Sequence, residues 1–350
     1  MKRKYVYIVA ALAVGALLFS GSARSQEVPP WPVKEKLLGA NGDKAEDVSG
    51  IACSSQTGFP RTCLLVDDEA QGAQIVIVRD GGLLAGDFIR LIYDAFEDDL
   101  LEFDGEGVAY ADGHFYVIGS HGHPRDKDKK LDPTKPKDAA KIKASIQASS
   151  RVIRITMDPS SVNDKGKLNA APEIKPSAEL RTLLAAQSQL KGFVDLRLDQ
   201  NGLTIEGIAV RDKRLFVGLR GPVLGDNGDK AAIYSVELAS LFEGKPGNPK
   251  LDLLALGKGR GVRDLVAIDK GLIVLAGPAA EEDGVYTAFH WDGGDARSLG
   301  DLPKFTGKKG KQSKPEGLLV LDNDVEGLRV LVLFDGPKEG SPRALRVSKP

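Results

Sequence analysis

A short pattern that opens a strand recurs five times along the chain: an acidic or small polar residue, then glycine or leucine, then apolar residues. The copies are Ser49-Gly-Ile-Ala-Cys53, Glu106-Gly-Val-Ala-Tyr110, Glu206-Gly-Ile-Ala-Val210, Asp264-Leu-Val-Ala-Ile268 and Glu316-Gly-Leu-Leu-Val320. They start 57, 100, 58 and 52 residues apart. A strand pattern repeated at such intervals is typical of propellers and other repeat arrays, in which each copy begins one structural unit.

Each copy continues as a hairpin, because a polar turn and a second apolar run follow it. The turns include Ala111-Asp-Gly-His114 and Arg211-Asp-Lys-Arg214. Further alternating runs, such as Gln74-Ile-Val-Ile-Val78, come after the second strand. About three to four strands per copy is the content of a propeller blade, so the sequence predicts an all-β fold, a β-propeller.

The copies favour five blades, and six remain open because the interval of 100 residues is long enough to contain a degenerate unit. Residues 26–350 would form one propeller domain. Val33-Lys-Glu-Lys-Leu-Leu38 precedes the first copy, and the last copy is followed by few strands beyond Ala344-Leu-Arg-Val347. Pairing of these two segments would close the ring with an N-terminal strand and remove an open sheet edge.

Two insertions are predicted within the long interval. Residues 124–143 contain eight Lys or Arg, four Asp and three prolines with almost no apolar residues, which is typical of a flexible surface loop. Residues 177–191 predict the one inserted helix, with Ser177 as its cap and Gly192 as its stop. Its apolar stripe consists of Leu180, Leu183, Leu184 and Leu190.

The first 25 residues predict a secretory signal peptide. Lys2, Arg3 and Lys4 form a positive start, residues 6–19 form an apolar stretch, and residues 20–25 are mostly small. An uncleaved anchor is disfavoured because a membrane-spanning helix needs about 20 apolar residues, and a buried helix would leave the cationic start unexplained. We therefore expect cleavage near Gln26 and a periplasmic or secreted protein with no membrane attachment after cleavage.

Two cysteines, Cys53 and Cys63, flank a turn-rich segment between two short apolar runs. In an oxidising compartment this arrangement favours a cross-strand disulfide, which would contribute about 3 kcal/mol by restricting the unfolded chain. A redox pair or a metal site would need closer spacing and further His or Cys residues nearby. The sequence therefore predicts a structural disulfide.

The residues that open the first strand of each copy should meet those that close the second, because the second strand returns to the face where the first begins. The openers are Glu106, Glu206, Asp264 and Glu316, with Glu46 and Asp47 close to the fifth. The closers are Asp67-Asp-Glu69, Ser120-His-Gly-His123, Arg220-Gly-Pro222, Gly277-Pro278 and Asp335-Gly-Pro337. Carboxylate oxygens suit Ca²⁺ and Mg²⁺, so the four acids are candidate ligands of a divalent cation, with Ca²⁺ first. The alternative for each acid is structural, accepting hydrogen bonds from the backbone of a neighbouring blade.

Two histidines break the repeat in the second closer. His121 and His123 are two residues apart, so in an extended chain both rings would point the same way, as a metal ion or a general base requires. The alternative is a solvated loop. Arg220 occupies the matching place in the next copy, and a guanidinium can hold a carboxylate or phosphate through two hydrogen bonds. We predict Arg220 and Ser120 as substrate contacts, while Ser120 as a nucleophile is disfavoured because the chain has no Gly-X-Ser-X-Gly elbow.

Several of these motifs also resemble those of a known family. They are Glu106-Gly-Val-Ala-Tyr110, Gly119-Ser-His-Gly-His123, Glu206-Gly-Ile-Ala-Val210, Gly218-Leu-Arg-Gly-Pro222, Arg263-Asp-Leu265 and Ala276-Gly-Pro278. Over most of its mature length the chain resembles the bacterial family called domain of unknown function 3616, which implies a propeller and export but no established activity.

The Glu-Gly strand starts resemble, more distantly, those of calcium-dependent propeller hydrolases of the esterase-like phytase and gluconolactonase groups. In the gluconolactonase group a glutamate at a strand start binds the metal, which would correspond to Glu106 or Glu206 here. The Asn and Asp partners that such sites use are not recognisable in this sequence.

Two functional hypotheses follow. The first is an exported hydrolase, with or without a metal, that acts on an anionic small molecule such as a phosphate ester or a lactone. The four acids would hold the cation, His121 or His123 would be the base, and Arg220 would bind the anion. The second is a non-catalytic propeller that binds a ligand or a protein on the same face. The net charge of −1 predicts no attraction to nucleic acid and leaves the oligomeric state open.

Overall fold

The computed structural model describes residues 28–124, 131–307 and 310–350. The predicted signal peptide over residues 1–25 and the predicted cleavage point at Gln26 lie outside these ranges. Residues 125–130 of the predicted charged loop also lie outside them. Within the described residues no helix combines the length and the apolar character needed to cross a membrane.

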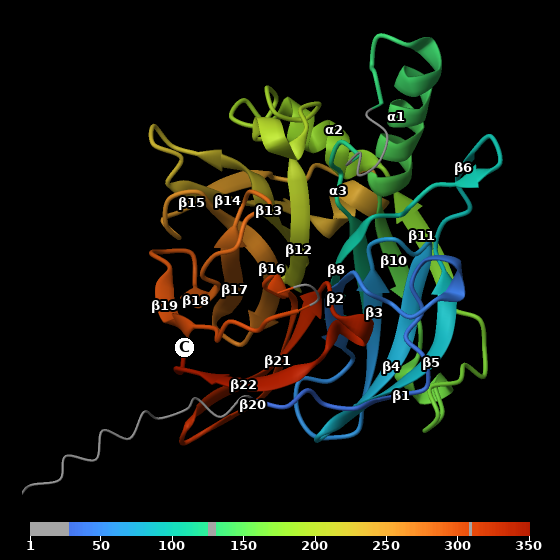
Figure 1. Cartoon of the computed structure of the whole chain (residues 1–350), viewed down its shortest axis with the longest axis vertical. Helices are drawn as coiled ribbons and strands as arrows, with labels where there is room; N and C mark the ends of the chain where they lie inside the picture. The colour runs from blue at the N-terminus through green and yellow to red at the C-terminus, as the bar shows by residue number, and fades with distance from the viewer. Residues whose placement is uncertain (1–27, 125–130, 308–309) are drawn as a thin grey trace, which may run out of the picture.

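The described strands form five blades around a common axis (Figure 1), which confirms the prediction of an all-β, five-bladed propeller. The first blade contains β2 (Val48–Cys53), β3 (Arg61–Asp67), β4 (Gly72–Arg79) and β5 (Gly82–Arg90). The second contains β8 (Gly105–Ala111), β9 (His114–Gly119), β10 (Val152–Thr156) and β11 (Glu173–Ser177). The third contains β12 (Thr204–Arg211), β13 (Arg214–Leu224), β14 (Lys230–Glu237) and β15 (Lys250–Leu254). The fourth contains β16 (Arg260–Ile268), β17 (Gly271–Pro278), β18 (Thr287–Trp291) and β19 (Arg297–Asp301), and the fifth contains β20 (Lys314–Asp324), β21 (Gly327–Asp335) and β22 (Arg343–Val347).

The innermost strands β2, β8, β12, β16 and β20 each contact the innermost strands of both neighbouring blades, and together they surround the axis. Glycine is required where these strands approach most closely. A Cβ atom on Gly107 would lie 3.1 Å from the Cα of Gly207, and one on Gly207 would lie 2.5 Å from the Cα of Asp264. The glycines of the second and third copies are therefore a packing requirement of the ring, because a side chain at Gly107 or Gly207 would collide with the next blade.

The N-terminal strand joins a different blade from the one predicted. Strand β1 (Val33–Lys34) pairs in parallel with β5, so it extends the outer edge of the first blade, while the last blade keeps only β20, β21 and β22. The prediction of closure by a shared N-terminal strand is therefore wrong. The chain does touch the last blade on its way, since the Trp31 N–H donates to the Pro342 carbonyl at 2.7 Å and Asp47 forms a β-bridge with Asp335.

The described residues of the long interval form helices and no sixth blade. Helix α2 (Glu179–Ala186) is shorter than the predicted 177–191, but Leu180, Leu184 and Leu190 of the predicted stripe are fully buried against the third blade. Ser177 lies at its start, where its hydroxyl accepts from the Glu179 N–H at 3.3 Å. A short helix, α3 (Leu238–Phe242), follows β14.

Part of the predicted charged loop is helical instead. Helix α1 (Pro136–Ser149) begins with a proline in its first turn, where the missing N–H breaks no helical hydrogen bond. It projects from the second blade beside a small hairpin of β6 (Ala95–Phe96) and β7 (Asp99–Leu100) (Figure 1). Lys137 pairs with Glu97 at 2.8 Å, and Ile142 and Ala148 are buried toward the blade. The lysines therefore form the outer face of a helix whose few apolar residues anchor it.

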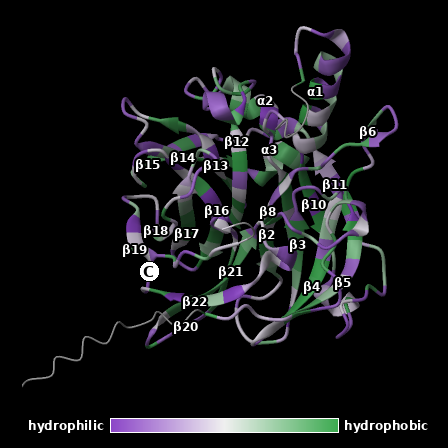
Figure 2. Ribbon diagram, viewed as in Figure 1, coloured by the Kyte–Doolittle hydropathy of each residue, from purple (hydrophilic) through white to green (hydrophobic). Residues whose placement is uncertain are grey.

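The apolar core lies between the blades, and Figure 2 shows hydrophobic residues concentrated along their strands. One such cluster joins the first two blades through Leu64, Ile75, Phe115 and Ile153. Cys53 and Cys63 lie opposite each other on β2 and β3 and form a disulfide, as the sequence predicts. Short 3-10 turns occur at Ala40–Gly42, Pro159–Ser161, Leu198–Gln200 and Lys338–Gly340.

Candidate functional site

Every innermost strand contains a register shift near its start, where one extra residue separates two paired ones. The extra residues are Ser49, Glu106, Glu206, Arg263 and Glu316. A bulge of this kind leaves its extra residue outside the ladder and redirects the side chain. We call these five residues the axial ring.

The register corrects one member of the predicted set. In the third blade the hairpin closes on the pair Arg211 and Arg214, five residues after Glu206. In the fourth blade it closes on Ile268 and Gly271, and five residues before Ile268 stands Arg263. Asp264 therefore matches the glycines of the other blades, and an arginine takes the place of the acid in this blade.

Asp264 is tied to the backbone rather than to the other acids. Its Oδ1 accepts from the Leu265 N–H and its Oδ2 from the Leu318 N–H of the next blade, both at 2.7 Å. Burial raises the pKa of Asp264 well above its ordinary value, although both backbone hydrogen bonds favour the charged form. This arrangement corresponds to the structural alternative for the acids, in which the side chain joins two blades.

The axial ring brings three of the predicted acids together. One oxygen from each of Glu106, Glu206 and Glu316 lies within 4.8 Å of the others, and each residue is at most 5% exposed. Arg263, which is fully buried, lies among them: its Nη2 is 3.4 Å from Glu206 Oε2 and donates to Glu316 Oε1. Ser49 adds a weak contact, with its hydroxyl 3.5 Å from Glu316 Oε2.

Arg220 is part of the same charged network. Its guanidinium is 1% exposed and donates to Glu206 Oε1 at 2.9 Å, to Glu281 Oε1 at 2.6 Å and, through Nε, to the Ala279 carbonyl at 2.8 Å. Lys314 continues the series, since its Nζ lies 2.6 Å from Glu281 and 3.2 Å from Asp335. The buried guanidinium of Arg220 therefore faces protein groups, which does not match the predicted direct contact with a substrate.

Two further sets of carboxylates connect the axial ring to the surface. Asp68, Asp104 and Glu106 have ligand atoms within 4.8 Å of one another, and so do Asp47, Asp68 and Glu69. The sets share Asp68 and Glu106, so together they form a continuous series of acids from the rim to the axis. Calcium binds oxygen at about 2.4 Å, so two ligands on opposite sides of one ion are about 4.8 Å apart, and each set fits this size.

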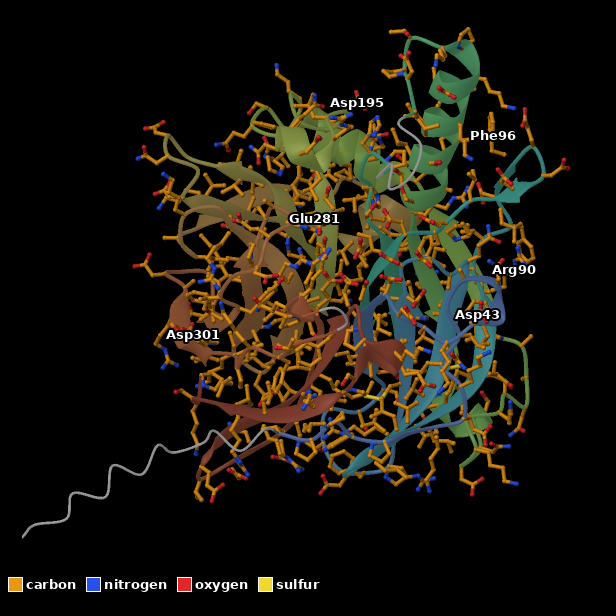
Figure 3. The ribbon with its side chains drawn as sticks, in the orientation of Figure 1. Asp43, Arg90, Phe96, Asp195, Glu281 and Asp301 are labelled. Atoms are coloured by element: carbon orange, nitrogen blue, oxygen red, sulfur yellow. A yellow bond between two sulfur atoms is a disulfide. The ribbon has the colours of Figure 1, made fainter. Side chains whose placement is uncertain are left out.

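A cavity of about 1040 Å³ lies over this end of the axis. Its lining contains acids, among them Asp47, Asp68, Glu281 and Asp335, and the cations Arg197, Lys258 and Lys314. In Figure 3 Glu281 lies toward the middle of the ring, whereas Asp301 lies at its outer edge. The closer residues Asp68, His123, Gly221 and Asp335 line this cavity together with Asp47, whereas the predicted acids Glu106, Glu206, Asp264 and Glu316 are buried and are not part of its lining.

Electrostatic effects on this face differ from group to group. Burial, together with the charges of Asp47 and Glu69, raises the pKa of Asp67 to about 7. Burial is the largest effect on Asp335 and opposes its ionisation, but the charges of Lys314 and Arg263 and the hydrogen bonds with Asp47 and Lys314 together hold the pKa of Asp335 below its ordinary value. The acidic closers thus include one carboxyl that holds its proton near neutral pH and one that stays ionised.

The two predicted histidines do not point the same way. His121 has φ of +55°, so the chain is not extended there, and its ring is fully buried with Nδ1 2.9 Å from the Gly119 carbonyl. Burial lowers the pKa of His121 to about 4, which keeps the ring neutral. His123 is half-buried and lines the cavity. Only His123 is therefore placed to act as a base on a bound molecule.

Ser120 is buried and serves the backbone. Its hydroxyl donates to Asp104 Oδ2 and accepts from the Gly122 N–H at 3.1 Å, while its carbonyl accepts from the Ile205 N–H of the next blade at 2.8 Å. The predicted substrate contact at Ser120 is replaced by a link between two blades that also orients Asp104.

Comparison with known protein families assigns this chain to one of them. Residues 76–346 match the model of the family described as protein of unknown function, DUF3616. The chain belongs to the DUF3616 family. The matched range includes four members of the axial ring and most of the cavity lining. Among proteins of curated function, no sequence matches this DUF3616 chain.

Comparison with solved structures finds matches of low similarity to this DUF3616 protein. A GH43 β-1,3-galactosidase bound to galactodeoxynojirimycin is 9% identical, covers 89% of this chain and 92% of its own, and has a TM-score of 0.41. A luciferin-regenerating enzyme is 10% identical over 87% and 92% of the chains, with a TM-score of 0.38. Virginiamycin B lyase from Staphylococcus aureus is 11% identical over 90% and 74%, with a TM-score of 0.31. Likeness at this level says nothing about activity.

Sequence reasoning missed three residues of the site. Arg263 was hidden because the shared alanine aligned Asp264 with the glutamates, and counting back from the hairpin turn would have found it. Asp104 lies two residues before Glu106, and Lys314 two residues before Glu316, so both belong to the loop or strand that enters the ring. Their proximity to the openers is the signal that could have identified them.

Proposed function

We propose that this DUF3616 protein is an exported hydrolase that depends on a divalent cation, Ca²⁺ first, and acts on an anionic small molecule such as a phosphate ester or lactone. The observation that carries the proposal is the series of three overlapping carboxylate sets, which leads from the cavity lining to the buried axis. Such a series concentrates negative charge where oxygen ligands are already close together. Large cavities lined by both acids and cations suit a charged ligand.

The middle set, Asp68, Asp104 and Glu106, is the one that we assign to the cation. Asp68 lines the cavity, and the Ser120 hydroxyl orients Asp104, so the set is both accessible and fixed. Oxygen donors of this kind suit a hard cation such as Ca²⁺. A divalent cation bound there would polarise a carbonyl or phosphoryl oxygen of the substrate.

The cations of the cavity would hold the anionic group. Burial alone would lower the pKa of Lys314, but the charges of Asp335 and Glu281 outweigh it and raise that pKa above its ordinary value. Lys314 therefore stays positively charged at neutral pH. Lys258 is exposed on the same lining and can approach a ligand from the rim. Together they would take the role that the sequence assigned to Arg220.

His123 is our candidate for the general base. Its Nδ1 lies 3.2 Å from the Pro124 carbonyl, and a carbonyl can only accept, so Nδ1 is the donor and Nε2 is the nitrogen left to act as a base. A neutral imidazole in this tautomer can take a proton from water at the cavity.

The rival function is ligand binding without turnover. It is favoured by the placement of Arg220 and His121, because both are buried and engaged with protein groups, and of the two predicted histidines only His123 lines the cavity. Under this alternative the cation would still bind, and the cavity would recognise a charged ligand without transforming it.

One set of measurements separates these functions. Protein purified without chelator is analysed for metals, titrated with Ca²⁺ by calorimetry and screened with esterase, lactonase and phosphatase substrates. We expect Asp68→Asn and Asp104→Asn each to weaken Ca²⁺ binding at least tenfold, because each removes one ionised ligand. The matched control is Glu282→Gln, which lines the cavity but belongs to none of the sets.

The outcomes are distinct. Calcium-dependent hydrolysis that Asp68→Asn abolishes supports the hydrolase, and loss of activity in His123→Ala with unchanged Ca²⁺ affinity supports the base. Calcium binding with no turnover of any substrate class supports the rival. No cation bound by the wild-type protein would overturn both the cation site and the hydrolysis that depends on it.

A further inference from the structure

The axial ring contains a cation of its own. Arg263 extends from the fourth blade, contacts Glu206 of the third at 3.4 Å and donates to Glu316 of the fifth. Its guanidinium therefore bridges carboxylates of two different blades at the axis. A metal ion held by these acids would occupy the same position and make the same connection.

The hydrogen bonds of Arg263 do not satisfy all of its buried nitrogens. Within the described part of the chain, Nε and Nη1 of Arg263 have no hydrogen-bond partner although the side chain is 0% exposed. Glu206 Oε2, 1% exposed, also lacks one. Buried polar atoms without partners are costly. The guanidinium therefore offsets negative charge in the ring, but its planar geometry leaves two of its own nitrogens unpaired. A spherical ion has no such directional requirement.

We propose that Arg263 is a built-in substitute for a divalent metal ion at the axis, and that the ring formed by Glu106, Glu206 and Glu316 binds such an ion when this side chain is removed. The three ligand atoms lie within 4.8 Å of one another, which is the span of a calcium coordination shell. The fold accepts a small neutral residue at this position, because Ser49 occupies the equivalent bulge of the first blade. The inference goes beyond the proposed hydrolase and does not depend on it.

The test is made in an Asp68→Asn background, which disables the outer carboxylate sets without touching the axial ring. Calorimetry with Ca²⁺ and with Mn²⁺ compares Asp68→Asn with Asp68→Asn/Arg263→Ser. We expect the second protein to bind one more equivalent. For a dissociation constant of about 0.1 mM, about 10 mM Ca²⁺ should raise its melting temperature by about 4 °C and leave that of Asp68→Asn unchanged.

Two further variants keep the test decisive. Arg263→Lys retains a positive charge and should gain no equivalent. Arg263→Ser/Glu206→Gln restores the net charge of the ring and should fold without added metal even if Arg263→Ser does not. The proposal is overturned if Arg263→Ser gains no equivalent of either ion. It is also overturned if Arg263→Ser cannot be recovered with Ca²⁺ present while the charge-restored variant can.

These outcomes are separable from the hydrolase proposal. Absence of cation binding by the wild-type protein would end that proposal but would leave the comparison of the two Asp68→Asn proteins intact.

Discussion

Replacing Arg220 with methionine should be among the most destabilising changes on this face. Arg220 and Glu206 are each 1% exposed and are 2.9 Å apart, and the same guanidinium holds Glu281 and the Ala279 carbonyl. The substitution leaves Glu206 with Arg263 at 3.4 Å as its remaining ion-pair partner. Removing one member of a buried ion pair costs about 3–5 kcal/mol, because the other charge stays buried and less well compensated.

Urea unfolding of the wild type and three variants measures this effect. Arg220→Met/Glu206→Gln removes both charges and should recover much of the loss, to within about 2 kcal/mol of the wild type. Arg197→Met is the matched control, because Arg197 and Asp199 are paired at 2.7 Å with side chains 49% and 66% exposed. Such an exposed pair contributes about 1 kcal/mol or less. A loss below about 1 kcal/mol for Arg220→Met, or no recovery in the double variant, would refute the assignment of Arg220 to a buried structural network.

Three further predictions concern pH and packing. Burial lowers the pKa of His121 to about 4, whereas the unfolded chain protonates this group below 6.5. The unfolding free energy should therefore fall by about 3 kcal/mol as the pH drops from 6.5 to 4. Urea titrations of His121→Asn should show a smaller fall, and an equal fall would contradict the burial argument. The pKa of Asp67 is raised to about 7, so the folded protein keeps a proton that the unfolded chain releases above about 4. The stability that this proton provides is lost as the pH rises from about 4 to about 7. Calorimetry at about pH 8 should therefore show a higher melting temperature for Asp67→Asn than for the wild type, and a lower one would contradict this assignment of Asp67. Gly207→Ala should lower the unfolding free energy by about 3 kcal/mol, because the added Cβ would lie 2.5 Å from the Cα of Asp264. Gly192 faces open space, so Gly192→Ala should change the unfolding free energy by about 0.5 kcal/mol or less. Equal effects of the two substitutions would show that the inner strands are not in close contact.

The repeat was sufficient to predict the fold because each copy combines a strand start, a turn and a second strand. The glycine in that pattern is now explained by the close approach of neighbouring inner strands, as at Gly107 and Gly207. Helix α1 escaped prediction because Ile142, Ala144 and Ala148 anchor it, too few apolar residues to outweigh the charged composition. The position of β1 depends on a parallel pairing with β5 across the sequence, which local patterns do not specify.

The sequence predicted which residues gather at one end of the propeller but not which groups each of them contacts. Closers from four blades line one cavity together with Asp47, because strand direction returns them to one face, but the four predicted acids are buried and do not line it. The roles of Arg263 and Asp264 depend on a one-residue bulge. Arg263 is the extra residue and extends to the axis, whereas Asp264, one residue later, accepts a hydrogen bond from the backbone of the next blade. The burial of His121 and Arg220 depends on tertiary packing, so the residue types that suggested chemistry could not show that both are enclosed.

The most direct test of the central claim is a crystal structure of the protein soaked in Mn²⁺, with an anomalous difference map calculated at the metal edge. We expect a peak among the carboxylates of Asp68, Asp104 and Glu106, and none between Arg263 and the glutamates of the axial ring. Ordered side chains at all three acids with no peak among them would contradict it.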